Sequence, residues 1–157
     1  MMKRILAVVR ILVGALFLSV SIKKFGDAGF FEPEGLAREL SQNGIAFPFY
    51  QAILDRYILP HATVFSYLVA TGELIVGLSF LLGAFTNLFS LVAIFMILNF
   101  SMAVCYGNIG SLIGHLVLIG VVALLGIYSA GSVWGLDSSL ARRLSPRVVF
   151  FPYRRER

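Results

Sequence analysis

Residues 62–82 read ATVFSYLVATGELIVGLSFLL, an apolar run broken by a single charged side chain, Glu73. A transmembrane helix needs about 20 mostly apolar residues to cross the hydrocarbon core. Similar runs occupy residues 88–106 and 112–130, and a fourth occupies residues 5–22. Because only a few residues link the last three runs, neighbouring helices must be antiparallel. The sequence predicts an all-α polytopic membrane protein, an antiparallel four-helix transmembrane bundle.

The overall composition supports a membrane protein and excludes two other classes. Of the 157 residues, 59% are hydrophobic, and the mean hydropathy is +0.89. Soluble domains contain roughly 45–50% apolar residues, so a water-soluble fold is excluded. The net charge is +5, but the basic residues gather at the chain ends and not in a stripe with exposed aromatics. We therefore expect contact with membrane lipid and no binding of nucleic acid.

The chain divides into a transmembrane domain, residues 1–140, and a basic cytoplasmic tail, residues 141–157. Between the first two runs lies a long interfacial segment, residues 23–60, which is too long for a bare loop. Pro33, the spacing of Leu36 and Leu40, and the stop at Asn43-Gly44 predict a short amphipathic helix over 34–42. A second helical stretch is expected over 49–59. Together they form either a cap over the bundle or a loop that rests on lipid.

The sequence offers few residues for metal or cofactor chemistry. A single cysteine, Cys105, excludes an intramolecular disulfide, a Cys-x-x-Cys pair and any all-cysteine metal site. No set of metal ligands is recognisable, so no metal is expected. A haem would require two facing histidines at matched depth, whereas His61 stands at the edge of its run beside Pro60. We do not expect a haem.

Two charged residues, Arg10 and Glu73, lie inside predicted spans, where a charge normally faces the bundle interior and finds a partner. Glu73 should lie roughly 14 Å deep at 1.5 Å per residue, and Asn99 on the next run should reach a similar depth. Arg10 is shallower, and its side chain could reach up to Glu73 or snorkel to the near surface. The three side chains form either a proton or head-group site, or an ion pair that fixes helix register.

His115 is the other candidate, about one turn inside the last run. It could pass a proton or donate a hydrogen bond to a quinone carbonyl. The alternative is an interhelical hydrogen bond with no further role.

Several short motifs occur in order along the chain: Arg10-x3-Gly14-x2-Phe17, Lys23-Lys24, Asn43-Gly44-Ile45-Ala46-Phe47-Pro48, Glu73-x3-Gly77-x3-Leu81-Leu82-Gly83 and Gly135-Leu136-Asp137. From about Arg10 to Leu140, the pattern resembles the DoxX family of four-helix membrane proteins, including its DoxD-like branch. The resemblance implies redox work at the membrane, since DoxD-like proteins are associated with thiosulfate:quinone oxidoreductase and other relatives with detoxifying enzymes. It also implies that Arg10, Lys23, Lys24 and Glu73 are the polar residues of the family.

Two functions follow from these residues and this resemblance. In the first, the protein is a quinone-associated subunit of a membrane redox system, and a quinone lies between the helices against Arg10, Glu73, Asn99 or His115. Because no catalytic set is recognisable, the chain would be at most a subunit of a quinone-linked oxidoreductase. In the alternative, it is a non-catalytic accessory subunit of a larger membrane respiratory or electron-transfer complex.

The positions of lysine and arginine predict the orientation in the membrane. Eight of them flank the first and last spans: Lys3, Arg4, Arg142, Arg143, Arg147, Arg154, Arg155 and Arg157. The interfacial segment holds four, diluted by five acidic residues. Both termini should therefore be cytoplasmic, in a bacterial or archaeal inner membrane. A C-terminal green fluorescent protein should fluoresce, and a C-terminal alkaline phosphatase should be inactive; the reverse pattern would contradict this orientation.

Overall fold

The computed structural model describes residues 2–144 and 146–151 and confirms the predicted fold class. Four helices are long and apolar enough to cross a membrane: α1 (Met2–Gly26), α4 (Ala62–Leu82), α5 (Thr86–Val104) and α6 (Ile109–Ile127). Within the described residues there is no β-strand. The protein is therefore an integral membrane protein built from helices.

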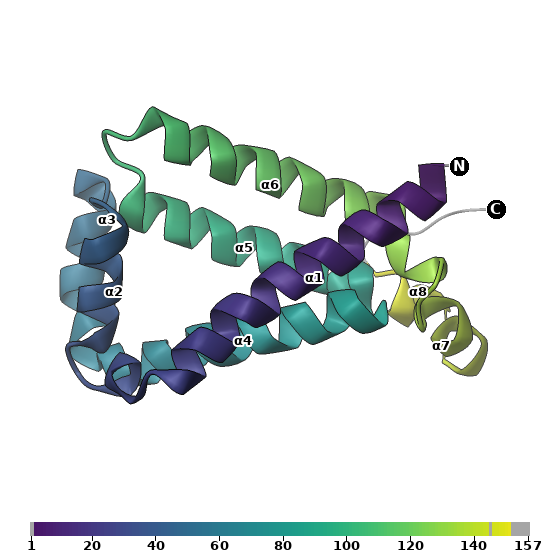
Figure 1. Ribbon diagram of the computed structural model, residues 1–157, viewed down its shortest axis with the longest axis horizontal. Coiled ribbons are helices and arrows are strands. Elements are labelled where there is room, and N and C mark those ends of the chain that lie inside the picture. The colour runs from purple at the N-terminus through teal and green to yellow at the C-terminus, as the bar shows by residue number, and fades with distance from the viewer. Residues whose placement is uncertain (1, 145, 152–157) are drawn as a thin grey trace.

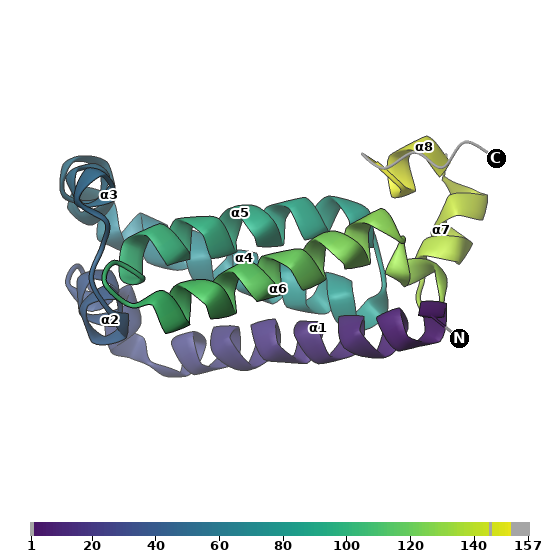
Figure 2. The same cartoon turned by 90° about the horizontal axis from the view of Figure 1, so that it is seen from above.

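The four long helices pack as two pairs, α1 along α4 and α5 along α6, and α4 also contacts α5 (Figures 1 and 2). Gly14 of α1 makes the first pairing possible, because a Cβ there would lie 2.8 Å from the backbone nitrogen of Leu81 and 3.0 Å from the carbonyl oxygen of Gly77. The core between the pairs is apolar: Val13, Phe17, Val76, Phe80, Ala93, Ile97, Val122 and Leu125. Many large apolar side chains point outward, as expected for helices surrounded by lipid.

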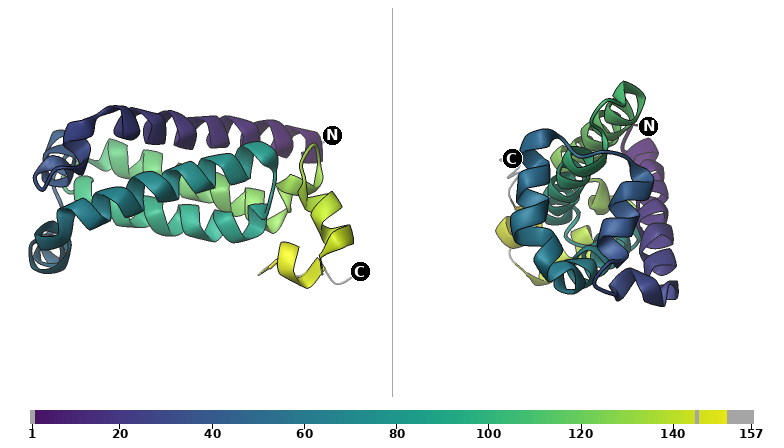
Figure 3. Two further views of the ribbon diagram at one scale, coloured as in Figure 1. Left: turned by 90° about the horizontal axis from the view of Figure 1, so that it is seen from below. Right: turned by 90° about the vertical axis from the view of Figure 1, so that its left-hand side faces the viewer.

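The interfacial segment forms a helical cap across one end of the bundle (Figure 3). It contains η1 (Ala28–Phe31), α2 (Gly35–Asn43) and α3 (Pro48–Ile53). A π-helical turn, η2 (Leu54–Ile58), and a 3-10 turn, η3 (Leu59–His61), then lead into α4. The stretch between α2 and α3 is hydrogen-bonded to the end of α5. Phe47 N–H donates to the Met102 carbonyl at 2.9 Å, and Tyr106 N–H donates to the Ile45 carbonyl at 2.9 Å. We call this end of the molecule the cap end.

At the other end lie the start of α1 and the last described residues of the chain, so we call it the termini end (Figure 1). It holds η4 (Ala130–Ser132), α7 (Asp137–Arg143) and α8 (Pro146–Val149). The predicted boundary at residue 140 falls inside α7. Val149 is fully buried, and the Phe150 carbonyl accepts a hydrogen bond from the Asn87 side chain at 3.3 Å, so this part of the tail packs against the bundle. The predicted basic residues 154, 155 and 157 lie outside the described residues.

The last span is displaced from its predicted position. Residues 112–130 were expected to be helical, whereas α6 covers Ile109–Ile127. The Asn108 side chain accepts a hydrogen bond from Ser111 N–H at 3.0 Å and so caps the helix three residues earlier. Hydropathy alone does not detect such a helix-capping hydrogen bond.

The close approach of α1 and α4 gives a test of the fold. Gly14→Ala should lower the free energy of unfolding by about 1–3 kcal/mol, the usual cost of overpacking, because the new methyl group meets backbone atoms of α4. Gly114→Ala on α6 is the matched control, since a Cβ there meets no atom within 4 Å. Denaturation in mixed micelles measures both variants. Equal effects at the two positions would contradict the observed packing of α1.

Candidate functional site

Arg10 is fully buried and holds the chain segment that follows α6. Its Nη1 donates to the carbonyls of Ala130 at 2.9 Å and Val133 at 3.2 Å, and its Nη2 donates to the carbonyl of Trp134 at 2.9 Å. Gly83 is required beside it, because its φ of 63° is left-handed and a Cβ would collide with Arg10 Nη1. Arg10 thus donates hydrogen bonds to carbonyls of the segment that follows α6, which lie in the protein interior where no water can satisfy them.

Asp137, also fully buried, holds the start of α5 at the same end. Its carboxylate accepts hydrogen bonds from the N–H groups of Phe85 at 2.6 Å and Thr86 at 3.2 Å. The Asp137 N–H in turn donates to the Gly83 carbonyl at 2.8 Å. Burial raises the pKa of the Asp137 carboxyl, while these donors and the Arg10 charge oppose that rise. Arg10 and Asp137 together fasten α1, the α4–α5 turn and the segment after α6, which is a structural role.

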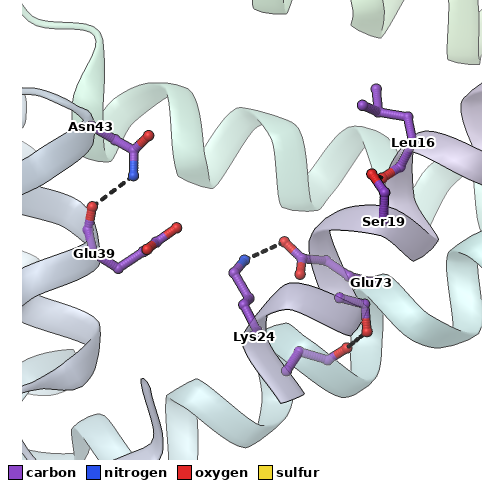
Figure 4. Close-up of polar contacts among 8 residues, drawn as sticks. Leu16, Ser19, Lys24, Glu39, Asn43 and Glu73 are labelled. Atoms are coloured by element: carbon purple, nitrogen blue, oxygen red, sulfur yellow. Dashed lines mark hydrogen bonds and ion pairs between the residues drawn. The ribbon is translucent and has the colours of Figure 1, made fainter. Parts of the chain in front are cut away.

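Glu73 does not meet Arg10 but pairs with Lys24 near the cap end. The Lys24 Nζ lies 2.5 Å from Glu73 Oε1, and the two side chains are only 8% and 12% exposed (Figure 4). The second carboxylate oxygen, Oε2, is buried and has no hydrogen-bond partner in the described part of the chain. Lys24 Nζ also lies 5.4 Å from the centroid of the buried Phe30 ring. This is a buried ion pair with spare hydrogen-bonding capacity, at a depth where charge is costly.

A third charged side chain reaches this ion pair from the cap. Glu39 of α2 extends toward Lys24 and Glu73 (Figure 4), and its charge acts on Glu73 through space. Its own carboxylate forms no hydrogen bond within the described residues, although its carbonyl accepts one from Asn43. We call Lys24, Glu39 and Glu73 the cap-end charge cluster.

Asn99, the third member of the predicted polar layer, has a different partner. Its Oδ1 accepts a hydrogen bond from the Tyr50 hydroxyl at 2.8 Å, and its Nδ2 donates to the Phe95 carbonyl at 2.7 Å. The Tyr50 side chain is buried, so this bond fastens α3 of the cap to α5.

His115 lies beside Cys105 at the turn between α5 and α6. The Cys105 Sγ and His115 Nδ1 are 3.0 Å apart, and Cys105 is only 2% exposed. Burial raises the pKa of the Cys105 thiol, which disfavours the reactive thiolate. The pair therefore acts as an interhelical hydrogen bond and not as an activated nucleophile.

An apolar groove of about 220 Å³ runs beside these two contacts, between the cap and the α5–α6 pair. It is lined by Phe47, Phe49, Leu98, Ser101, Met102, Leu112 and Leu116. Its lining suits a hydrocarbon chain.

The four predicted site residues thus fall into four separate contacts. Arg10 and Lys24 both belong to α1 and lie about 21 Å apart along it, at 1.5 Å per residue. Because Glu73 contacts Lys24, it is beyond the reach of the Arg10 side chain. The predicted Arg10, Glu73 and Asn99 layer is therefore not one site. Sequence reasoning missed the roles of Glu39 and Tyr50. No signal in the sequence pointed to them, because both depend on how the cap folds over the bundle.

Among the described residues, no group of three His, Cys, Asp or Glu side chains could hold a metal ion.

A sequence profile of the family described as methylamine utilisation protein MauE matches residues 2–115, more than two thirds of the chain. The chain belongs to the MauE family. No solved structure matches the chain. The match covers α1, the cap, α4, α5 and the start of α6, and so it includes all three members of the cap-end charge cluster.

Membership of the MauE family corrects the expected membership of the DoxX family, which is wrong. The structure explains why the motifs misled. Gly14 allows close helix contact, Arg10 satisfies carbonyls, and Asp137 caps α5. These are packing requirements of a small membrane bundle and do not identify one family.

The Lys24–Glu73 pair gives a test by double substitution. Lys24→Met leaves the Glu73 carboxylate buried without a counter-charge, which should cost about 3–5 kcal/mol of unfolding free energy. Lys24→Met combined with Glu73→Leu should recover most of that loss, since no lone charge remains. Lys23→Met is the matched control, because Lys23 is exposed. Additive losses in the double variant, measured by unfolding in mixed micelles, would show that the two residues do not interact.

Proposed function

We propose that the protein is a non-catalytic accessory component of a membrane redox system for methylamine utilisation, and that the cap-end charge cluster is its functional site. The family description supplies the system. The observation that carries the assignment is the Lys24–Glu73 pair, 88% or more buried, with one carboxylate oxygen left free of hydrogen bonds.

Buried polar atoms without a hydrogen-bond partner occur at both ends of the described chain, so the lone Oε2 atom does not set the cap end apart. Charge balance does. At the termini end Arg10 faces Asp137, whereas at the cap end Glu39 and Glu73 face the single ammonium group of Lys24. An uncompensated carboxylate is costly away from water. Such a group is a functional-site candidate because its cost has to be offset by a benefit elsewhere. Its place under the cap suits contact with a partner or ligand that arrives from the cap side of the membrane.

Quinone binding stays a prediction, and the apolar groove favours the cap half of α5 and α6 as its place. The apolar groove there could hold an isoprenoid tail, and Asn99 and His115 lie on the helices that line it. Arg10 is engaged at the termini end and cannot contribute. Extraction of the purified protein followed by chromatography tests this directly; quinone-free protein with unaltered quinone-dependent activity in its membranes would remove the prediction.

The accessory function is tested by deleting the gene in the native host. The deletion strain should fail to grow with methylamine as nitrogen source yet grow normally with ammonium. The wild-type gene and Lys23→Met should restore growth, whereas Glu73→Gln, matched for protein level in the membrane, should restore it at least tenfold less well. Normal methylamine-dependent growth of the deletion strain would overturn the proposed function.

A further inference from the structure

The cap-end charge cluster holds two carboxylates and one ammonium group. Lys24 comes from α1, Glu73 from α4 and Glu39 from α2, and these are the charged side chains that face the site from the three elements (Figure 4). Lys24 bonds only one oxygen, Glu73 Oε1. The Glu39 carboxylate and Glu73 Oε2 have no hydrogen-bond donor within the described residues. The cluster therefore lacks one positive charge and several N–H or O–H donors.

The geometry restricts what could supply them. Calcium and magnesium ions take six or more oxygen ligands, whereas two carboxylates face this site. No group of three metal-binding side chains exists in the described ranges. A primary ammonium ion carries one positive charge and three N–H donors, which match the free carboxylate oxygens.

The burial of the cluster limits the size of the ligand. Lys24 and Glu73 are only 8% and 12% exposed, so a ligand that contacts them has to be small and cannot be a long polyamine. Glu39 belongs to the cap, so a ligand that bridges Glu39 and Glu73 would also fasten α2 to α4.

We propose that Glu39 and Glu73, with Lys24 beside them, bind a small primary ammonium ion of the methylammonium type under the cap. The inference deepens the proposed function by naming a ligand class for the same site. It needs the proposed function only to explain why such an ion is present, because binding is measured on the purified protein.

The test uses the full-length protein in detergent micelles at neutral pH. Methylammonium chloride should raise the unfolding temperature saturably by a few degrees, because a ligand that binds only the folded state stabilises it. Tetramethylammonium chloride has no N–H donor and sodium chloride has no organic cation, so neither should do so at the same ionic strength. Isothermal titration calorimetry should show one site per chain.

Two variants of the cap separate specific binding from general charge effects. Glu39→Gln should weaken methylammonium binding at least tenfold, while Glu34→Gln, an exposed carboxylate on the same cap, should bind as the wild type does. Glu39→Gln removes no hydrogen bond of the fold, so it should remain folded. No saturable shift, an equal shift with tetramethylammonium, or full binding by Glu39→Gln would each overturn the proposal. A shift with pH but none with methylammonium would mean that the site takes a proton, and would overturn it as well.

Binding in vitro with normal methylamine-dependent growth of the deletion strain would leave this site in place and remove the proposed function. Loss of methylamine-dependent growth in the deletion strain, without methylammonium binding by the purified protein, would support the proposed function and remove this site.

Discussion

The lipid interior offers no water to satisfy a charge or a free backbone carbonyl, and this constraint shapes the whole molecule. At the termini end it is met chiefly by two residues, although Arg10 Nε, Thr86 Oγ1 and Asn87 Oδ1 are buried without a partner among the described residues. Arg10 collects three carbonyls from the segment after α6, and Asp137 caps the start of α5. The two side chains join the ends of four helices by hydrogen bonds. The bundle therefore does not depend on long loops for its packing.

The two ends differ in charge balance, and this difference is what points to function. One arginine faces one aspartate at the termini end, whereas two carboxylates face one ammonium group at the cap end. Lys24 and Glu73 neutralise each other, but one Glu73 oxygen and the nearby Glu39 carboxylate are left over. Around them, Tyr50 and Asn99 fasten the cap to α5, and Cys105 and His115 fasten α5 to α6. The cap end is thus a rigid frame around an unsatisfied charge cluster.

Hydropathy and loop length were enough to predict the all-α bundle, because about 20 apolar residues admit few other structures in lipid. They left open whether the interfacial segment caps the bundle or rests on lipid. They could not predict which charges meet. That depends on the register of α1 against α4, which small residues such as Gly14 set and apolar content does not. Depth in the membrane was the reason to expect Glu73 and Asn99 in one layer. In the structure Glu73 pairs with Lys24 from the end of α1, and Asn99 bonds Tyr50 from the cap. The DoxX resemblance failed for a related reason, since its motifs reflect helix packing.

The central claim is that the buried carboxylate of Glu73 is neutralised by Lys24. The chain has only three lysines, Lys3, Lys23 and Lys24, so solid-state NMR in lipid bilayers can measure dipolar coupling between lysine ¹⁵Nζ and glutamate ¹³Cδ with little overlap. The structure predicts one strong coupling, corresponding to a distance of about 4 Å or less, that persists in Lys23→Arg and disappears in Glu73→Gln. The absence of any such coupling, or a coupling of Glu73 to an arginine side chain instead, would contradict the account.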